Sequence, residues 1–305
     1  MKGKLFLFLK GFFMGSADVI PGVSGGTIAL VTGIYERLLE GIRSVDLKLP
    51  LYLIRGEGEK AAASLREIDL FFFLPLSAGI ISALLLGARL VTYFLDRFPA
   101  FTYAFFCGLI FASAYLVYGR SRENSPAFFL ALSIGLIGAT LFVGLETLAM
   151  NHGALVLFAS GAVAVCAMIL PGISGAFILL LLGQYRFILE AVQNPLHKLP
   201  SLSLFVVGAA VGLPLFAHLL GRLLDRHKNP TLGFLTGLML GALRRPVEEI
   251  LSSVTAGGKS WGLGSPALST ALLFLSALGG VAIVVLFGSK TEVKGDEAEA
   301  SPEKG

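Results

Sequence analysis

Two stretches of this sequence, 150 residues apart, repeat the same helix-breaking motif within apolar sequence. Residues 20–40 read IPGVSGGTIALVTGIYERLLE, and residues 170–190 read LPGISGAFILLLLGQYRFILE. In both copies the apolar sequence continues on either side of a Pro-Gly-x-Ser-Gly break. Lipid does not tolerate unpaired backbone N–H and C=O groups, so such a break persists only where protein or a wet cavity surrounds it. Corresponding broken segments in two halves of one chain are typical of a transporter's binding site.

The composition indicates that these breaks lie within a membrane. Of the 305 residues, 55% are hydrophobic and 14% are charged, and the mean hydropathy is +0.81. A soluble domain carries about 25% charged residues, so the sequence predicts a polytopic membrane protein. Apolar runs of about the 20 residues that a membrane helix needs are 70–94, 100–118, 127–149, 201–221, 231–243 with its flanks, and 267–288.

The two broken segments are interpreted as re-entrant hairpins, each of which enters and leaves the membrane on the same side. The first hairpin is expected over residues 4–44 and the second over residues 154–193. After the breaks, half-helices are expected over 27–42 and 176–192. A kinked full span is the alternative interpretation of each segment.

The repeat continues beyond the hairpins, at an offset of 129 residues. The matches are Leu95-Asp96-Arg97 with Leu224-Asp225-Arg226, and Phe105, Gly108 and Leu109 with Phe234, Gly237 and Leu238. A charged, amphipathic insert over 46–68, too polar to span, explains why this offset is shorter than 150. Each half, 1–149 and 150–289, then contains one hairpin and three spans. An odd number of crossings inverts the second half, so the sequence predicts an all-α membrane protein of two inverted-topology repeats.

The distribution of Lys and Arg predicts the orientation of the chain. If the N-terminus lies inside, most of the Lys and Arg residues in the connecting segments fall on the inner face, as the positive-inside rule requires. We therefore expect a multi-pass plasma-membrane protein whose N- and C-termini are cytoplasmic. The tail 290–305 is charged and poor in apolar residues, which predicts disorder.

The residues that follow each break are candidates for binding an anion. They are Ser24, Gly25, Gly26 and Thr27 after the first break, and Ser174 and Gly175 after the second. A helix start presents free N–H groups and a partial positive charge, and serine adds a hydroxyl donor. Two such starts facing each other would bind an anion, most naturally a phosphate. The alternative is that these small residues serve only close helix packing.

Charged residues near the apolar segments are further candidates, since each costs about 2.5–3.5 kcal/mol at the centre of a membrane helix. Arg37 and Arg186 fall within the re-entrant arms, and Arg244 and Arg245 close a span. Each is a candidate to contact a phosphate, although extension of the side chain to the interface is the commoner fate of such arginines. Asp18 precedes the first break and is a candidate for binding a coupling ion, or alternatively for capping the hairpin tip.

The doubled motif carries a family resemblance that extends over almost the whole chain. The run FFMGSADVIPGVSGGTIALVTGIYERLL and its echo LPGISGAFILLLLGQY resemble the PopT family of polyprenyl-phosphate transporters. Membership implies flipping of undecaprenyl phosphate from the outer to the cytoplasmic leaflet, with the phosphate at the paired helix starts and the prenyl tail in lipid. In an archaeal host a dolichyl-type carrier would replace this lipid.

Two other functions compete with this expectation. Pro21-Gly22-Val23-Ser24 resembles the P-G-x-S-R-S motif of membrane undecaprenyl-diphosphate phosphatases, and Glu36 and Glu40 resemble their paired glutamates. Gly25 and Gly175, however, stand where that motif has the arginine that stabilises phosphoryl charge, which argues against an enzyme. The third candidate is an ion-coupled carrier of a small anion. The sequence indicates no metal, organic cofactor or nucleic-acid partner, and it leaves open proton or sodium coupling and the oligomeric state.

Overall fold

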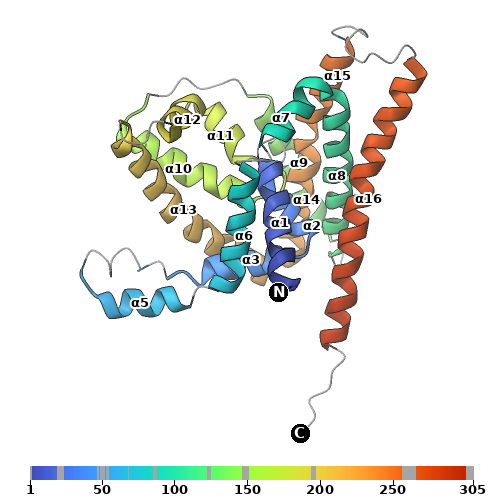
Figure 1. Cartoon of the computed structure of the whole chain (residues 1–305). Coiled ribbons are helices and arrows are strands. Elements are labelled where there is room, and N and C mark those ends of the chain that lie inside the picture. The colour runs from blue at the N-terminus through green and yellow to red at the C-terminus, as the bar shows by residue number, and fades with distance from the viewer. Residues whose placement is uncertain are drawn as a thin grey trace.

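Helices form all the regular secondary structure in the part of the chain that the computed structural model describes (Figure 1). The described residues are 2–18, 24–46, 48, 52, 55–67, 69–84, 88–121, 125–145, 151–193, 197–255 and 266–299. The predicted all-α class is therefore confirmed. Pro21 and Gly22 of the first break lie outside the described residues.

The helices of the first half precede residue 150. They are α1 (Lys2–Asp18), α2 (Gly25–Val31), α3 (Tyr35–Arg43), α5 (Gly58–Arg66), α6 (Leu70–Ser82), α7 (Ala88–Arg97), α8 (Pro99–Gly119) and α9 (Pro126–Val143). Those of the second half are α10 (Ala154–Ile169), α11 (Gly175–Leu181), α12 (Tyr185–Gln193), α13 (Leu199–Arg226), α14 (Lys228–Ala242), α15 (Arg244–Thr255) and α16 (Pro266–Glu299).

Among the described residues, four helices are long and apolar enough to cross a membrane: α8, α9, α13 and residues 268–286 of α16. The pair α11 and α12, bent by 116° at their junction, would count as a fifth span. Within the expected spans 70–94 and 231–243, α6 and α14 are shorter than a membrane-spanning helix: α6 ends at Ser82, and α14 has 15 residues. At 1.5 Å per residue α14 is only about 22 Å long, but it is largely buried and packs against α8 and α9.

Each half-helix after a break is itself interrupted, so the expectation of one continuous helix is wrong at both places. α2 and α3 are separated at Gly33, and α11 and α12 are separated at Gly183. These glycines have φ angles of 70° and 69°, a region that residues with a side chain rarely adopt. Each ends its helix in a Schellman-type turn, in which the next residue's N–H donates to Ala29 O in the first copy and to Leu179 O in the second.

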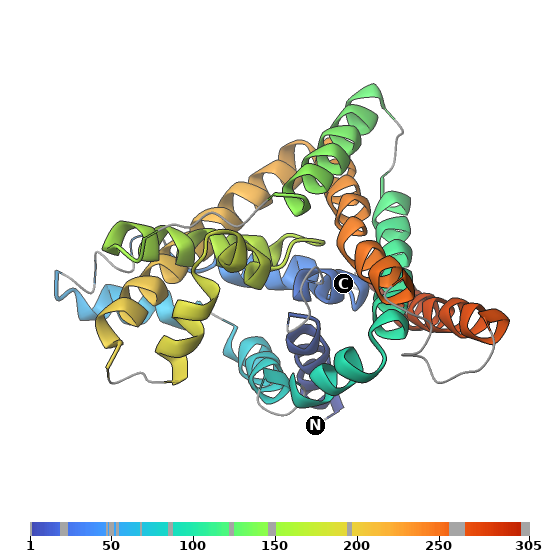
Figure 2. The ribbon, with the colours of Figure 1, turned by 90° about the horizontal axis from the view of Figure 1, so that it is seen from above.

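The same pattern of close helix contacts occurs twice. α1 packs on α6 as α10 packs on α13, and α8 packs on α16 as α14 packs on α9. Seen from above, α1 and α2 lie between α10 and α13 on one side and α8, α14 and α16 on the other (Figure 2). At each contact a Cβ on a glycine would clash with a carbonyl oxygen, in the matching pairs Gly11–Leu76 and Gly161–Phe205, and Gly108–Ala277 and Gly237–Leu132.

Two polar segments flank this bundle. The insert 46–68 contains α5, which stands apart from the other helices in Figure 1. α16 continues to Glu299, so the structure has helix over 290–299 where the sequence predicts disorder. The extension needs no new helix nucleus, because it continues a long apolar helix and is rich in Glu, Lys and Ala.

Candidate functional site

The two breaks contact each other in the interior of the protein. The Ser24 hydroxyl donates a hydrogen bond to Leu170 O at 3.1 Å. The backbone N–H of Gly172 donates to the Thr27 hydroxyl oxygen, also at 3.1 Å. Ser24 and Thr27 are fully buried, and a Cβ on Gly26 would lie 2.6 Å from Ile169 O. The structure thus brings residues of the first motif into direct contact with the second motif.

The backbone N–H groups at the start of α2 donate to the chain's own oxygen atoms. The Asp18 carboxylate accepts a hydrogen bond from Gly25 N at 2.7 Å, and the Ser24 hydroxyl oxygen accepts one from Gly26 N at 3.1 Å. Ser24 O accepts a third from Thr27 N. Asp18 therefore occupies the place in which a ligand anion would meet the start of α2.

The second break has a different environment. Ser174 is 2% exposed, and its hydroxyl has no hydrogen-bond partner among the described residues. With Arg245, Phe142, Phe177 and neighbouring residues, Ser174 lines a cavity of about 10 Å³, here called the serine cavity. This volume accommodates about one water molecule. Gly172, with φ +88°, forms the turn that leads into it.

Of the four predicted arginines, Arg245 lines a cavity together with a motif serine. Arg245 does so from the start of α15, where it forms an ion pair with Glu249 at 2.9 Å. Arg244 pairs with Glu248 and donates to Thr140 O, which ties α15 to α9.

The two arginines of the re-entrant arms lie elsewhere. Arg37 pairs with Asp69 at 2.6 Å and stacks over Phe72, linking α3 to the start of α6. The hydrogen bond from Arg37 is the main cause that lowers the pKa of the Asp69 carboxyl group. Arg186 is exposed on α12. The structure does not bring Arg37 or Arg186 to either break.

A second, larger cavity was not anticipated from the sequence. It has a volume of about 410 Å³ and lies between α3, α8, α13 and α14, on the face where α1 begins (Figure 1). We call this face the N side and the cavity the N-side cavity. Its charged lining residues are Glu36, Glu40, Arg43, Arg120, Asp225 and Lys228. One sequence signal was available: Asp225 belongs to a repeated Leu-Asp-Arg motif.

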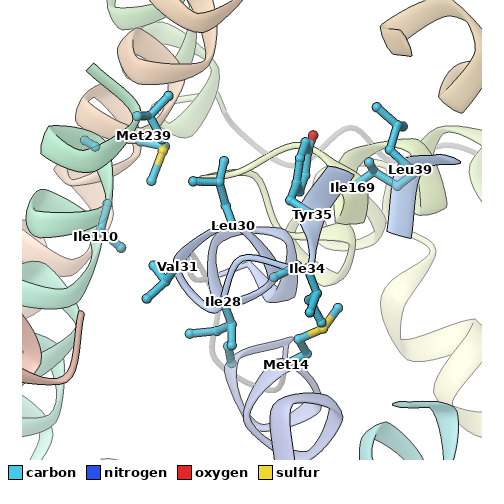
Figure 3. Packing of buried hydrophobic residues seen from close by; sticks show 14 of the residues in the cluster. Met14, Ile28, Leu30, Val31, Ile34, Tyr35, Leu39, Ile110, Ile169 and Met239 are labelled. Carbon is cyan, nitrogen blue, oxygen red and sulfur yellow. The ribbon is translucent and has the colours of Figure 1, made fainter. Parts of the chain in front are cut away.

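Buried apolar side chains, among them Leu30 and Met239, pack together in the interior of the protein (Figure 3). Leu30 and Leu235 line the N-side cavity. One helical turn beyond Leu235, the backbone of Met239 approaches Gly172 of the serine cavity so closely that a Cβ on Gly172 would lie 2.9 Å from its Cα. Leu30 and Met239 are almost fully buried. A ligand that passes from one cavity to the other must therefore displace buried apolar side chains.

Known proteins are similar to this chain in sequence. Residues 14–258 match the undecaprenyl phosphate translocase-like family. The chain belongs to this family. A polyprenyl-phosphate transporter of Vibrio cholerae is 42% identical over 250 residues, which are 81% of this chain and 80% of that protein. A polyprenyl-phosphate transporter of Staphylococcus aureus is 30% identical over 254 residues, 77% of this chain and 83% of the relative. No solved structure matches.

The resemblance inferred from the doubled motif is thereby confirmed. In this translocase-like protein, Glu36 and Glu40 line the N-side cavity, whereas Ser24 is buried against Leu170. Glu36 and Glu40, which resemble the paired glutamates of the phosphatase alternative, therefore line a cavity whose described lining does not include Ser24. Among the described residues no group of His, Cys, Asp and Glu is arranged to hold a metal ion.

Proposed function

We propose that this protein carries a polyprenyl phosphate, such as undecaprenyl phosphate, across the plasma membrane. The observation that supports this most strongly is the contact between the two motifs, beside which the buried Ser174 hydroxyl, without a hydrogen-bond partner among the described residues, shares a cavity with Arg245. A hydroxyl donor and a guanidinium group suit a phosphate headgroup. Two relatives named polyprenyl-phosphate transporters provide independent support.

The proposed architecture is a pair of inverted repeats, each with a re-entrant hairpin. Matching glycine contacts in the two halves support it, and so does the 116° bend between α11 and α12. In Figure 1, α3 lies at the lower side of the protein and α12 at the upper side, as hairpins that enter from opposite faces require. α16 ends on the side where α1 begins, which supports two termini on one face, proposed to be cytoplasmic.

The proposed mechanism is alternating access, in which one repeat moves against the other around the two breaks. In a state in which the two breaks have separated and the serine cavity, about 10 Å³ in the structure, has widened, the headgroup binds Ser174 and Arg245 and contacts Ser24, Gly25, Gly26 and Thr27 of the first motif. A phosphate at the start of α2 would repel the ionised Asp18 carboxylate, which accepts from Gly25 N. Protonation of Asp18 would remove that repulsion, so proton uptake is proposed to accompany headgroup binding. The direction is proposed to be from the outer to the cytoplasmic leaflet.

The test is reconstitution of the full chain in liposomes with labelled undecaprenyl phosphate. Transfer between leaflets and release of inorganic phosphate are measured separately. We expect transfer without phosphate release, and we expect transfer to fall at least ten-fold in Arg245→Gln, the loss that about 1.4 kcal/mol represents. Arg186→Gln removes the same charge from an exposed position on α12 and serves as the control. Phosphate release by the wild-type protein, or no transfer at all, would contradict the proposal.

A further inference from the structure

The N-side cavity brings together three cations from three helices. Arg43 comes from the end of α3, Arg120 follows α8, and Lys228 begins α14. The cavity volume of about 410 Å³ lies within the range of small-molecule sites, about 300–1,000 Å³. Neither motif supplies these residues, and the equivalent of Arg43 in the second copy is Gln193. The cluster is therefore specific to the N side of the protein.

Arg43 is held in place by its neighbours. Its guanidinium group pairs with Asp225 of α13 at 2.9 Å, and its side chain is 29% exposed. The side chain lies directly over Gly221, where a Cβ would be only 2.6 Å from its Cδ, Nε and Cζ atoms. Arg120 and Lys228 are exposed and form no ion pair with the described residues. The cavity therefore has one preorganised guanidinium group and two cations that are available to a ligand.

The remaining walls are mainly apolar. Leu30, Leu39, Val117, Leu224, Leu232 and Leu235 line them. Tyr35 also lines the cavity; it is 4% exposed, and its hydroxyl has no hydrogen-bond partner among the described residues. In Figure 3 this hydroxyl points away from Met14 and Ile34. Cations beside an apolar wall suit a ligand with an anionic head and a hydrocarbon tail.

We propose that the N-side cavity binds the phosphate monoester of a polyprenyl phosphate, as a second headgroup site on the N side. Arg43, Arg120 and Lys228 surround the phosphate, and the apolar wall contacts the first isoprene units. A phosphate monoester carries about −1.5 to −2 charges at pH 7, and it replaces Asp225 as the partner of Arg43. This inference rests on the proposed transport function and adds a site that the doubled motif does not contain.

Three carboxylates share the same lining and limit how tightly the site binds. Glu36, Glu40 and Asp225 lie in the same cavity as the cations. Their negative charge repels the phosphate and lowers the affinity of the site. A second site in a transporter must bind its ligand weakly enough to release it. A test can use this opposition, because removing a cation and removing a carboxylate must change the affinity in opposite directions.

The experiment measures binding of farnesyl phosphate, a short polyprenyl phosphate, to the full chain in detergent. Lys228→Gln and Arg120→Gln should each weaken binding by about ten-fold, which corresponds to about 1.4 kcal/mol. Glu40→Gln should strengthen it. Arg226→Gln is the matched control, because Arg226 is exposed near Lys228 but does not line the cavity. Equal effects of Lys228→Gln and Arg226→Gln, or weaker binding in Glu40→Gln, would overturn the proposal.

Two further ligands identify what the site recognises. Farnesol, which lacks the phosphate, should not displace farnesyl phosphate, and inorganic phosphate should displace it only at much higher concentration. Displacement by inorganic phosphate at equal concentration would mean that the site binds phosphate alone and would overturn the lipid assignment. Leaflet transfer separates the two proposals: if the wild type transfers undecaprenyl phosphate but Lys228→Gln behaves as Arg226→Gln does, only the second site is refuted.

Discussion

Asp18 and Met168 occupy equivalent positions before the two breaks and give them different polarity. The Asp18 carboxylate accepts a hydrogen bond from Gly25 N. At the second break the Met168 side chain packs close to Gly175, where a Cβ would lie 2.6 Å from Met168 Cγ. The start of α2 is thus bonded to an internal carboxyl group, whereas the Ser174 hydroxyl after the second break has no hydrogen-bond partner among the described residues. The two motifs, although similar in sequence, are therefore chemically distinct.

This difference predicts opposite consequences for the two motif serines. Ser24→Ala removes the side chain that caps α2 and bonds to Leu170 O, so we expect the free energy of unfolding to fall by about 0.5–2 kcal/mol. Ser174→Ala removes a hydroxyl that has no partner among the described residues, so stability should change little while transport falls. Thermal unfolding in detergent and the liposome assay measure the two effects. A stability loss in Ser174→Ala as large as that in Ser24→Ala would contradict this distinction.

At the scale of helices, glycine determines how closely neighbours approach. α9 and α14 meet at Gly135, where a Cβ would clash with Phe234 O. Gly138, one turn further along α9, has nothing within 4 Å of an added Cβ. Lipid tails are as apolar as the helix surfaces, so the hydrophobic effect does not drive membrane helices together. Such helices associate instead through close packing at small residues. The sequence predicts that glycines matter, but periodicity alone does not tell which ones face a neighbour.

The two glycines of α9 form a matched pair for a mutational test. Gly135→Ala should push α9 away from α14 and lower the free energy of unfolding by about 1–3 kcal/mol. Gly138→Ala should be neutral or stabilising by up to about 1 kcal/mol, because alanine favours the helix. Unfolding of the detergent-solubilised protein compares the variants. Equal effects of both substitutions would mean that the contact with α14 does not govern these positions.

At the scale of the whole molecule, the two halves are interleaved. The last helix of each half packs on a helix of the other half, α16 on α8 and α9 on α14. The ion pair between Arg43 and Asp225 joins α3 of the first half to α13 of the second. Neither half therefore completes its packing alone.

The proposed inverted topology predicts opposite accessibility for two exposed helices. Glu59 lies on α5 in the insert, and Arg186 lies on α12. With Cys107 and Cys166 replaced by alanine, a membrane-impermeant maleimide should label Arg186→Cys in intact cells. Glu59→Cys should react only after permeabilisation. Labelling of both from the same side would contradict hairpins that enter from opposite faces.

The sequence by itself determined the features that depend on local chemistry. Hydropathy determined the membrane class, the doubled break identified the family, and the offset of the motifs indicated two related halves. Gly33 and Gly183 carried the signal for a helix end, but the apolar arm around each was interpreted as continuous. Local pattern was sufficient here because composition and helix-breaking residues act within a few turns.

Only the tertiary structure decided which distant side chains meet. Ser24 bonds to Leu170, 146 residues away, and Arg43 pairs with Asp225, 182 residues away. Asp18 accepts a hydrogen bond from the start of α2, and Arg245, one of the four predicted arginines, shares a cavity with a motif serine. These contacts depend on how the helices of the two halves cross, and the spacing of residues along the sequence does not determine those crossings. The motif supplied candidate residues, and packing selected among them.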